Sequence, residues 1–174
     1  MAIDPRTLYK LMILYMLHKV NFPLTGTQIS DFILTRDYTD FNHLQQSFSE
    51  LIEASLVDCE NIHNTSRYMI TDDGEQTLEF FGKNIPAAIV DEMDDYLREN
   101  KFKMRSEVST VADYYKSSVS DYTVRCEVRE GKTVVIALEL SVPDEQQAEH
   151  MCSRWKERSS EIYAYTLKSL MSES

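Results

Sequence analysis

The sequence predicts an α+β protein with two small domains, residues 1–84 and 85–174. Three observations lead to this prediction. Residues 24–81 contain two amphipathic helical stretches joined by a polar turn and followed by a hairpin. Residues 122–142 alternate apolar and polar side chains with the two-residue period of a strand. Pro143 then opens a helical pattern that continues almost to the end of the chain, so the second domain is expected to have the order α-β-β-β-α.

The N-terminal domain is expected to begin with a helix that Pro5 starts and that ends near Lys19. Thr25 and Gln28 have the spacing of a capping box, which predicts a helix from about Thr25 to Arg36. A polar turn over residues 37–40 separates it from a second helix. The apolar residues of this second helix recur with the helical period: Phe41, Leu44, Phe48, Leu51 and Ile52.

A hairpin and a third helix complete this domain. The stretches Val57–Ile62 and Arg67–Ile70 flank a polar tetrapeptide suited to a hairpin tip. Thr71 is a good N-cap, and Asp72 and Asp73 place negative charge on the first helical turn, where the helix dipole favours it. The order of helix, turn, helix and hairpin is that of a winged helix-turn-helix, whose second helix would enter the major groove of DNA.

Three segments carry a resemblance to a known class of protein: Leu24–Ile29, Leu51–Val57 and Arg67–Gly74. Over residues 5–84 the chain resembles the winged-helix domains of small bacterial transcriptional regulators of the PadR and MarR kind. Over its whole length it looks closest to a bacterial domain-of-unknown-function family that joins such a domain to a small α/β tail. The resemblance implies a fold and a regulatory role, and it implies no particular ligand or operator.

The candidate DNA-binding residues follow from this arrangement. The polar face of the second helix would reach base edges in the major groove, two arginines would hold phosphates, and the hairpin tip would approach the adjacent backbone. The base-reading set is Asn42, His43, Gln45, Gln46 and Ser49; the phosphate set is Arg36 and Arg67; the tip is represented by His63 and Asn64. The competing interpretation of the polar set is an ordinary solvated helix face.

Charge opposes DNA binding, because non-specific affinity for DNA comes mostly from Lys and Arg. The chain has a formal net charge of −11. Residues 1–84 alone contain six Lys and Arg against twelve Asp and Glu, a net of −6, and the second helix contains neither Lys nor Arg. The sequence therefore leaves two functions open: a DNA-binding transcriptional regulator acting as a homodimer, and a winged-helix protein-interaction module that does not bind DNA.

The second domain is expected to dimerise or to sense an unidentified protein or small-molecule effector. A helix should follow Pro86 and end near Glu99, and a third strand is expected within Met104–Tyr115. The apolar stripe of the last helix runs from Ala148 to Leu170, roughly 30 Å at about 1.5 Å per residue. This length exceeds what a three-stranded sheet is expected to cover, so part of the stripe should contact a second copy. The alternative is a monomer in which the last helix folds back over the first helix of its own domain.

Other functions have little support. The four histidines are scattered, and no metalloprotease, nucleophile-elbow or phosphate-loop pattern occurs, so we expect neither an enzyme nor a cofactor or metal site. Cys59, Cys126 and Cys152 lie far apart, which is typical of buried free thiols. The apolar stretch of residues 11–17 is too short to span a bilayer and no leader pattern is present, which predicts a cytoplasmic protein with no membrane contact.

Overall fold

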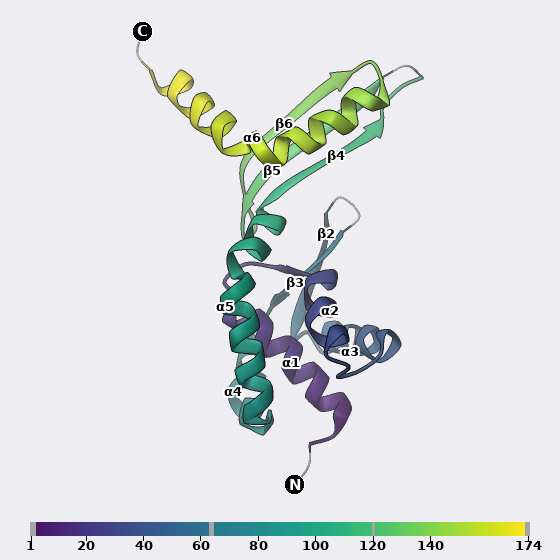
Figure 1. The fold of residues 1–174 in the computed structure, drawn as a ribbon, viewed down its shortest axis with the longest axis vertical. Helices are drawn as coiled ribbons and strands as arrows, with labels where there is room; N and C mark the ends of the chain where they lie inside the picture. The colour runs from purple at the N-terminus through teal and green to yellow at the C-terminus, as the bar shows by residue number, and fades with distance from the viewer. Residues whose placement is uncertain (1–2, 63–64, 120, 173–174) are drawn as a thin grey trace. The chain divides into compact units, whose positions relative to one another are not determined.

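The structure is a computed structural model, and it describes residues 3–62, 65–119 and 121–172. The described residues form six α-helices, one short 3-10 helix and two three-stranded antiparallel sheets (Figure 1). The elements, in chain order, are α1 (Pro5–Lys19), β1 (Leu24–Thr25), α2 (Gly26–Thr35), α3 (Phe41–Glu53), β2 (Val57–Ile62), β3 (Thr65–Ile70), α4 (Asp72–Phe81), η1 (Gly82–Asn84), α5 (Ala87–Ser109), β4 (Thr110–Lys116), β5 (Tyr122–Glu130), β6 (Thr133–Val142) and α6 (Glu145–Met171). The chain divides into two compact units, residues 1–105 and 106–174.

Helices α2, α3 and α4 of unit 1 begin at N-cap residues that the sequence predicts. The Thr25 hydroxyl accepts a hydrogen bond from the Gln28 backbone N–H at 3.1 Å, and the Gln28 side chain accepts one from the Thr25 N–H at 3.0 Å, which completes the capping box. Asp40 caps α3 and Thr71 caps α4 with a single hydrogen bond each, which their side chains accept from the backbone N–H groups of His43 and Gly74. The turn before α3 places Asp37 at φ 56°, a left-handed conformation that aspartate tolerates better than most residues.

The sheet of unit 1 has the strand order β1-β3-β2. The short strand β1 pairs with β3, so that Leu24 lies opposite Tyr68 and Thr25 opposite Arg67. On the core side the Tyr68 ring stacks on Phe48 of α3 with 4.5 Å between ring centroids. The hairpin β2–β3 was expected, but β1 was not, and its pairing makes β3 the central strand.

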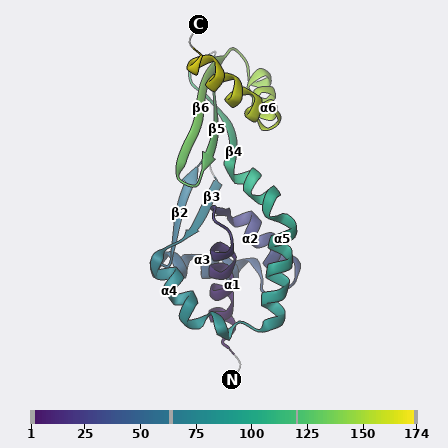
Figure 2. The ribbon, with the colours of Figure 1, turned by 90° about the vertical axis from the view of Figure 1, so that its left-hand side faces the viewer.

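Helix α5 belongs mostly to unit 1, which moves the domain boundary from the predicted residue 84 to residue 105. The physical reason is its packing. The Tyr15 hydroxyl donates to Asp94, the rings of Phe32 and Tyr96 lie 5.0 Å apart, and the Gln28 amide donates to the Met104 carbonyl at 3.0 Å. Figure 2 shows α5 along the side of this unit.

Unit 2 has the strand order β4-β5-β6, with α6 along one face of the sheet (Figure 1). Its core consists of Val124 and Cys126 from β5 packed against Ala148 and Trp155 from α6. The Trp155 indole N–H donates to the buried carbonyl of Glu127 at 3.1 Å. The α-β-β-β-α order along the chain and the antiparallel three-stranded sheet are confirmed, but the first of these helices, α5, belongs mostly to unit 1, so the predicted domain with a helix at each end is wrong.

The junction between α5 and β4 differs from the prediction. The sequence favours strand over Met104–Tyr115, but the helix continues to Ser109 before the strand begins at Thr110. Met104 and Val108 are both buried and lie four residues apart, so they share one helix face. The alternation of apolar and polar residues that begins at Val108 fits a strand equally well, so the sequence pattern alone misplaces the boundary between α5 and β4.

Candidate nucleic-acid interface

Helix α3 buries the middle of its apolar stripe, whereas Phe41 and Ile52 at its two ends are 60% and 39% exposed. Leu44, Phe48 and Leu51 are buried at 2% exposure or less. The side chains predicted to read bases are all exposed on the other face: Asn42, His43, Gln45, Gln46 and Ser49. The predicted orientation of this helix is confirmed, and the five polar residues form one continuous accessible face.

The N-terminal end of this face is negatively charged. The Asp40 carboxylate accepts hydrogen bonds from the His43 backbone N–H and lies 2.8 Å from the His43 ring nitrogen Nδ1. The backbone hydrogen bond from His43 is the main cause that lowers the pKa of Asp40, with the His43 side chain next. The carboxylate is therefore ionised at neutral pH, and it holds the His43 ring beside the first turn of α3.

The charge of Glu50, farther along α3, is compensated by Lys10 of α1, whereas Glu53 at the end of the helix adds a further negative charge. Lys10 lies 2.9 Å from Glu50, and this contact is the main cause that lowers the pKa of Glu50, with a smaller contribution from the charge of Arg6. The Gln46 amide also donates to Glu50 at 3.1 Å. Arg6 and Lys10 were not among the predicted site residues. Their i,i+4 spacing on the first helix is the signal that identifies them as one cationic face.

Arg36 has a different role from the one predicted. Its guanidinium lies 4.3 Å from the Phe32 ring centroid and 5.3 Å from that of Tyr96, and its Nε is 3.8 Å from a Glu92 carboxylate oxygen. These contacts join α2 to α5. The side chain remains about one-third exposed, but its charge is already balanced by Glu92.

Arg67 was predicted to hold a phosphate, and this prediction is wrong. It is only 5% exposed. Because β1 pairs with β3, Arg67 lies in the central strand between Thr25 and Glu60 rather than on an open hairpin edge. His63 and Asn64, the predicted contacts at the hairpin tip, lie outside the described residues.

Unit 1 is acidic as a whole. Residues 1–105 contain 10 Lys and Arg against 17 Asp and Glu, a net charge of −7. Moving α5 into this unit therefore leaves the electrostatic objection to DNA in place. Any DNA contact must rely on the local balance around α3, where Lys10 and Arg6 offset Glu50.

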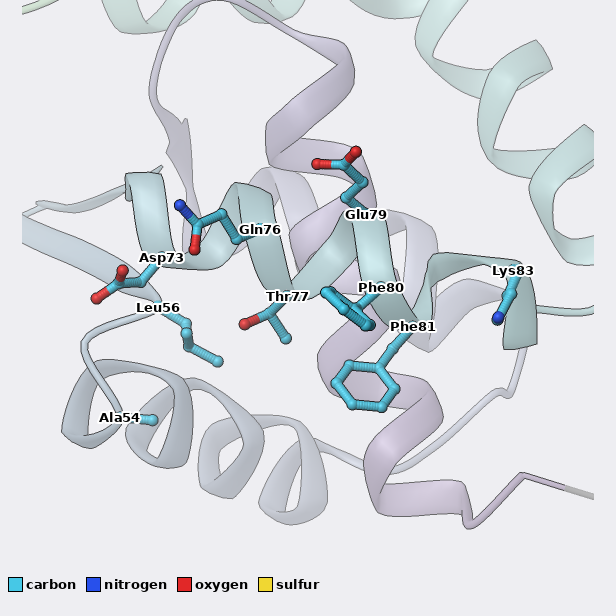
Figure 3. Close-up of a pocket in the computed structure, with 9 residues that line it drawn as sticks. All are labelled: Ala54, Leu56, Asp73, Gln76, Thr77, Glu79, Phe80, Phe81 and Lys83. Carbon is cyan, nitrogen blue, oxygen red and sulfur yellow. The ribbon is translucent and has the colours of Figure 1, made fainter.

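A second accessible feature lies between α4 and the end of α3. It is an open hollow of about 910 Å³ (Figure 3). The Phe80 and Phe81 rings face it and are 74% and 50% exposed. Asp73 and Lys83 lie toward its opposite ends. The lining residues are Ala54, Leu56, Asp73, Gln76, Thr77, Glu79, Phe80, Phe81 and Lys83, which we call the Phe80–Phe81 groove.

The three cysteines differ in exposure, and Cys152 packs against the unit 2 core that contains Cys126. Cys126 is buried, Cys152 is half-buried and Cys59 is exposed, so the prediction of buried thiols is wrong for Cys59. Within residues 3–62, 65–119 and 121–172, no group of three or more His, Cys, Asp or Glu side chains has an arrangement suited to a metal ion. In the same ranges no helix is long and apolar enough to cross a membrane.

These features define a mixed α and β protein with an exposed polar helix face in one unit and a helix-covered antiparallel sheet in the other. The chain belongs to the family described as "Domain of unknown function (DUF4364)", whose model matches residues 9–170. It has no match among the curated proteins and none among the solved structures. The family match spans both units, so the two units are a joint feature of the family.

Proposed function

We propose that residues 5–84 act as a winged-helix DNA-binding domain and that the protein is a homodimeric transcriptional regulator. The observation that carries the proposal is the exposed polar face of α3, whose opposite face is anchored in the core. In this role α3 is the recognition helix and the β2–β3 hairpin is the wing.

The side chains take distinct roles in this proposal. Asn42 and Gln45 contact base edges, for which their amide groups are well suited, and Ser49 adds a hydroxyl farther along the helix. Gln46 and His43 are held by Glu50 and Asp40, which fixes their orientation before DNA arrives. The hairpin-tip contacts of His63 and Asn64 remain predictions.

Phosphate contacts come from α1 in place of Arg67. Lys10 neutralises Glu50 and, together with Arg6, supplies positive charge beside α3. Two cations per protomer give weak non-specific binding, so affinity must come from base contacts and from pairing two protomers on one site. The DNA affinity of such an acidic regulator should therefore depend on the base sequence more strongly than the affinity of a regulator with a basic surface does.

Selection from a pool of double-stranded DNA with a randomised centre, at about 50 mM salt, tests the proposal. We expect enrichment of a motif with two-fold symmetry and half-sites about 10 base pairs apart. Gln45→Ala should alter base preference at defined positions, whereas Lys10→Ala should weaken binding to all sequences. Lys83→Ala removes an exposed cation from a different element and is the matched control. The absence of both enrichment and salt-dependent binding overturns the proposal.

The Phe80–Phe81 groove favours a second candidate function, a protein-interaction module. Exposed aromatic pairs of this kind are common anchors at protein interfaces. The acidic charge of unit 1, with Asp73 and Glu79 at the groove, fits a partner segment that carries apolar side chains flanked by Lys or Arg.

A photo-crosslinking amino acid at position 80 identifies such a partner in cells, and titration of the purified partner then tests the groove. Phe80→Ser should weaken that binding at least tenfold while leaving DNA selection unchanged. Equal binding by the wild type and by Phe80→Ser excludes the groove as the contact surface.

A further inference from the structure

Phe41, the first residue of α3, is exposed although it belongs to the apolar stripe of that helix. Its side chain is 60% exposed, whereas Leu44, almost one turn farther along, is fully buried. The apolar stripe therefore begins before the part of α3 that the core covers, and a phenyl ring stands open to a partner at the start of the helix.

The Phe41 ring lies beside the side chains that we propose to contact bases. An α-helix turns by about 100° per residue, so Gln45 lies about 40° from Phe41 around the helix and Asn42 about 100° in the same direction. Both polar side chains are exposed. Because the N-terminal residues of a recognition helix enter the major groove, a groove that receives Asn42 and Gln45 also receives Phe41.

The charge next to Phe41 favours a base contact over a backbone contact. Asp40 directly precedes the ring, and its carboxylate accepts a hydrogen bond from the His43 backbone N–H at 2.8 Å. This negative charge repels a DNA phosphate. On the floor of the major groove the apolar group available to an aromatic side chain is the C5-methyl group of thymine.

We propose that the Phe41 ring contacts the C5-methyl group of a thymine at or next to the base pair that Gln45 contacts. This inference rests on the proposed function and adds a specified base to it. Because a Gln amide pairs best with adenine, the two neighbouring side chains together select a sequence that contains an A·T pair.

A single methyl group sets the expected size of the effect. Deoxyuridine lacks this methyl group and keeps the O4 acceptor that thymine presents in the major groove. Loss of one buried group of this size weakens binding about fourfold. A site with two-fold symmetry contains the contact twice, so replacement in both half-sites should weaken binding roughly fifteenfold.

The full chain and the duplex enriched in the DNA selection are used for the test. Deoxyuridine replaces each thymine of the motif in turn, in both half-sites, and fluorescence anisotropy measures affinity at about 50 mM salt. The wild type should lose affinity roughly fifteenfold at one thymine position. Phe41→Ala should bind the thymine and deoxyuridine duplexes equally at that position, because its side chain is too short to keep the contact.

Phe102→Ala is the matched control, because it removes a phenyl ring that is 88% exposed on α5. It should retain the preference of the wild type for thymine. Circular dichroism verifies that each variant is folded.

The outcomes distinguish this inference from the proposed function. A preference for thymine that disappears in Phe41→Ala and persists in Phe102→Ala supports the methyl contact. A wild type that binds its motif equally well with thymine and deoxyuridine at every position overturns this inference alone, as does a preference that Phe41→Ala retains. The absence of any enriched motif overturns the proposed function and this inference with it.

Discussion

Replacing Phe48 with Ala is the most direct perturbation of the proposed recognition helix. Phe48 is 2% exposed, and its ring stacks on Tyr68 at 4.5 Å between centroids. Truncation of a buried Phe costs about 3–5 kcal/mol from lost burial and the cavity that remains. Single domains are stable by roughly 5–15 kcal/mol, so this loss removes a large share of the stability of unit 1.

Urea unfolding of the full chain, followed by circular dichroism, measures the effect. With a slope of roughly 2 kcal/mol per molar urea, the transition of unit 1 should move down by about 2 M. Trp155, the single tryptophan, lies in unit 2, so its fluorescence follows that unit separately and should shift less. Phe80→Ala removes the same ring from an exposed position and should change stability by less than about 0.5 kcal/mol. A Phe48→Ala loss below about 1 kcal/mol would refute the packing of α3 described above.

Three further predictions concern other parts of the molecule. Gly74→Ala should destabilise unit 1 by about 2 kcal/mol in the same urea assay, because a Cβ at this position meets the Leu56 carbonyl oxygen and the Ile70 side chain. This overpacking exceeds the gain of about 1 kcal/mol in helix propensity, so unchanged stability would contradict the prediction. Burial raises the pKa of the Cys126 thiol to about 11, whereas Cys59 is exposed, so a maleimide at pH 8 should label Cys59 first and Cys126 only on unfolding, as peptide mass analysis can determine. Burial and the hydrogen bond to Glu92 raise the pKa of Tyr38 to about 12 from its ordinary value of 10. The contribution of the neutral phenol is therefore complete below pH 10 and is lost as the pH rises toward 12, so the free energy of unfolding should fall less steeply over that window in Tyr38→Phe than in the wild type.

The local elements were predictable because their signals lie within a few residues of each other. The Thr25–Gln28 capping box, the Asp40 cap and the alternation of β5 each specify an element without reference to the rest of the chain. Asn42, Gln45 and Gln46 were correctly placed on the exposed face for the same reason, since the apolar period of α3 fixes the opposite side.

The errors come from pairings between distant segments. Arg67 carries no local sign of burial, and only the two-residue strand β1 makes its strand central. Arg36 looks like a free cation until Glu92 and Tyr96 of α5 pack beside it. The same long-range packing moves the domain boundary from residue 84 to residue 105, near the end of α5. A short strand of two residues has too little pattern for periodicity to detect it.

The two candidate functions use different surfaces of unit 1, so variants can separate them within one folded chain. The polar face of α3 and the Phe80–Phe81 groove share no residue. Lys10 provides the sharpest distinction, because removing it exposes the charge of Glu50 as well as deleting a cation. For DNA binding both changes act in the same unfavourable direction, whereas for a basic protein partner the additional negative charge is neutral or favourable. Lys10→Ala should therefore lower DNA affinity more than Lys83→Ala does, and a Lys10→Ala variant that binds DNA as well as the wild type would exclude Lys10 as a phosphate contact.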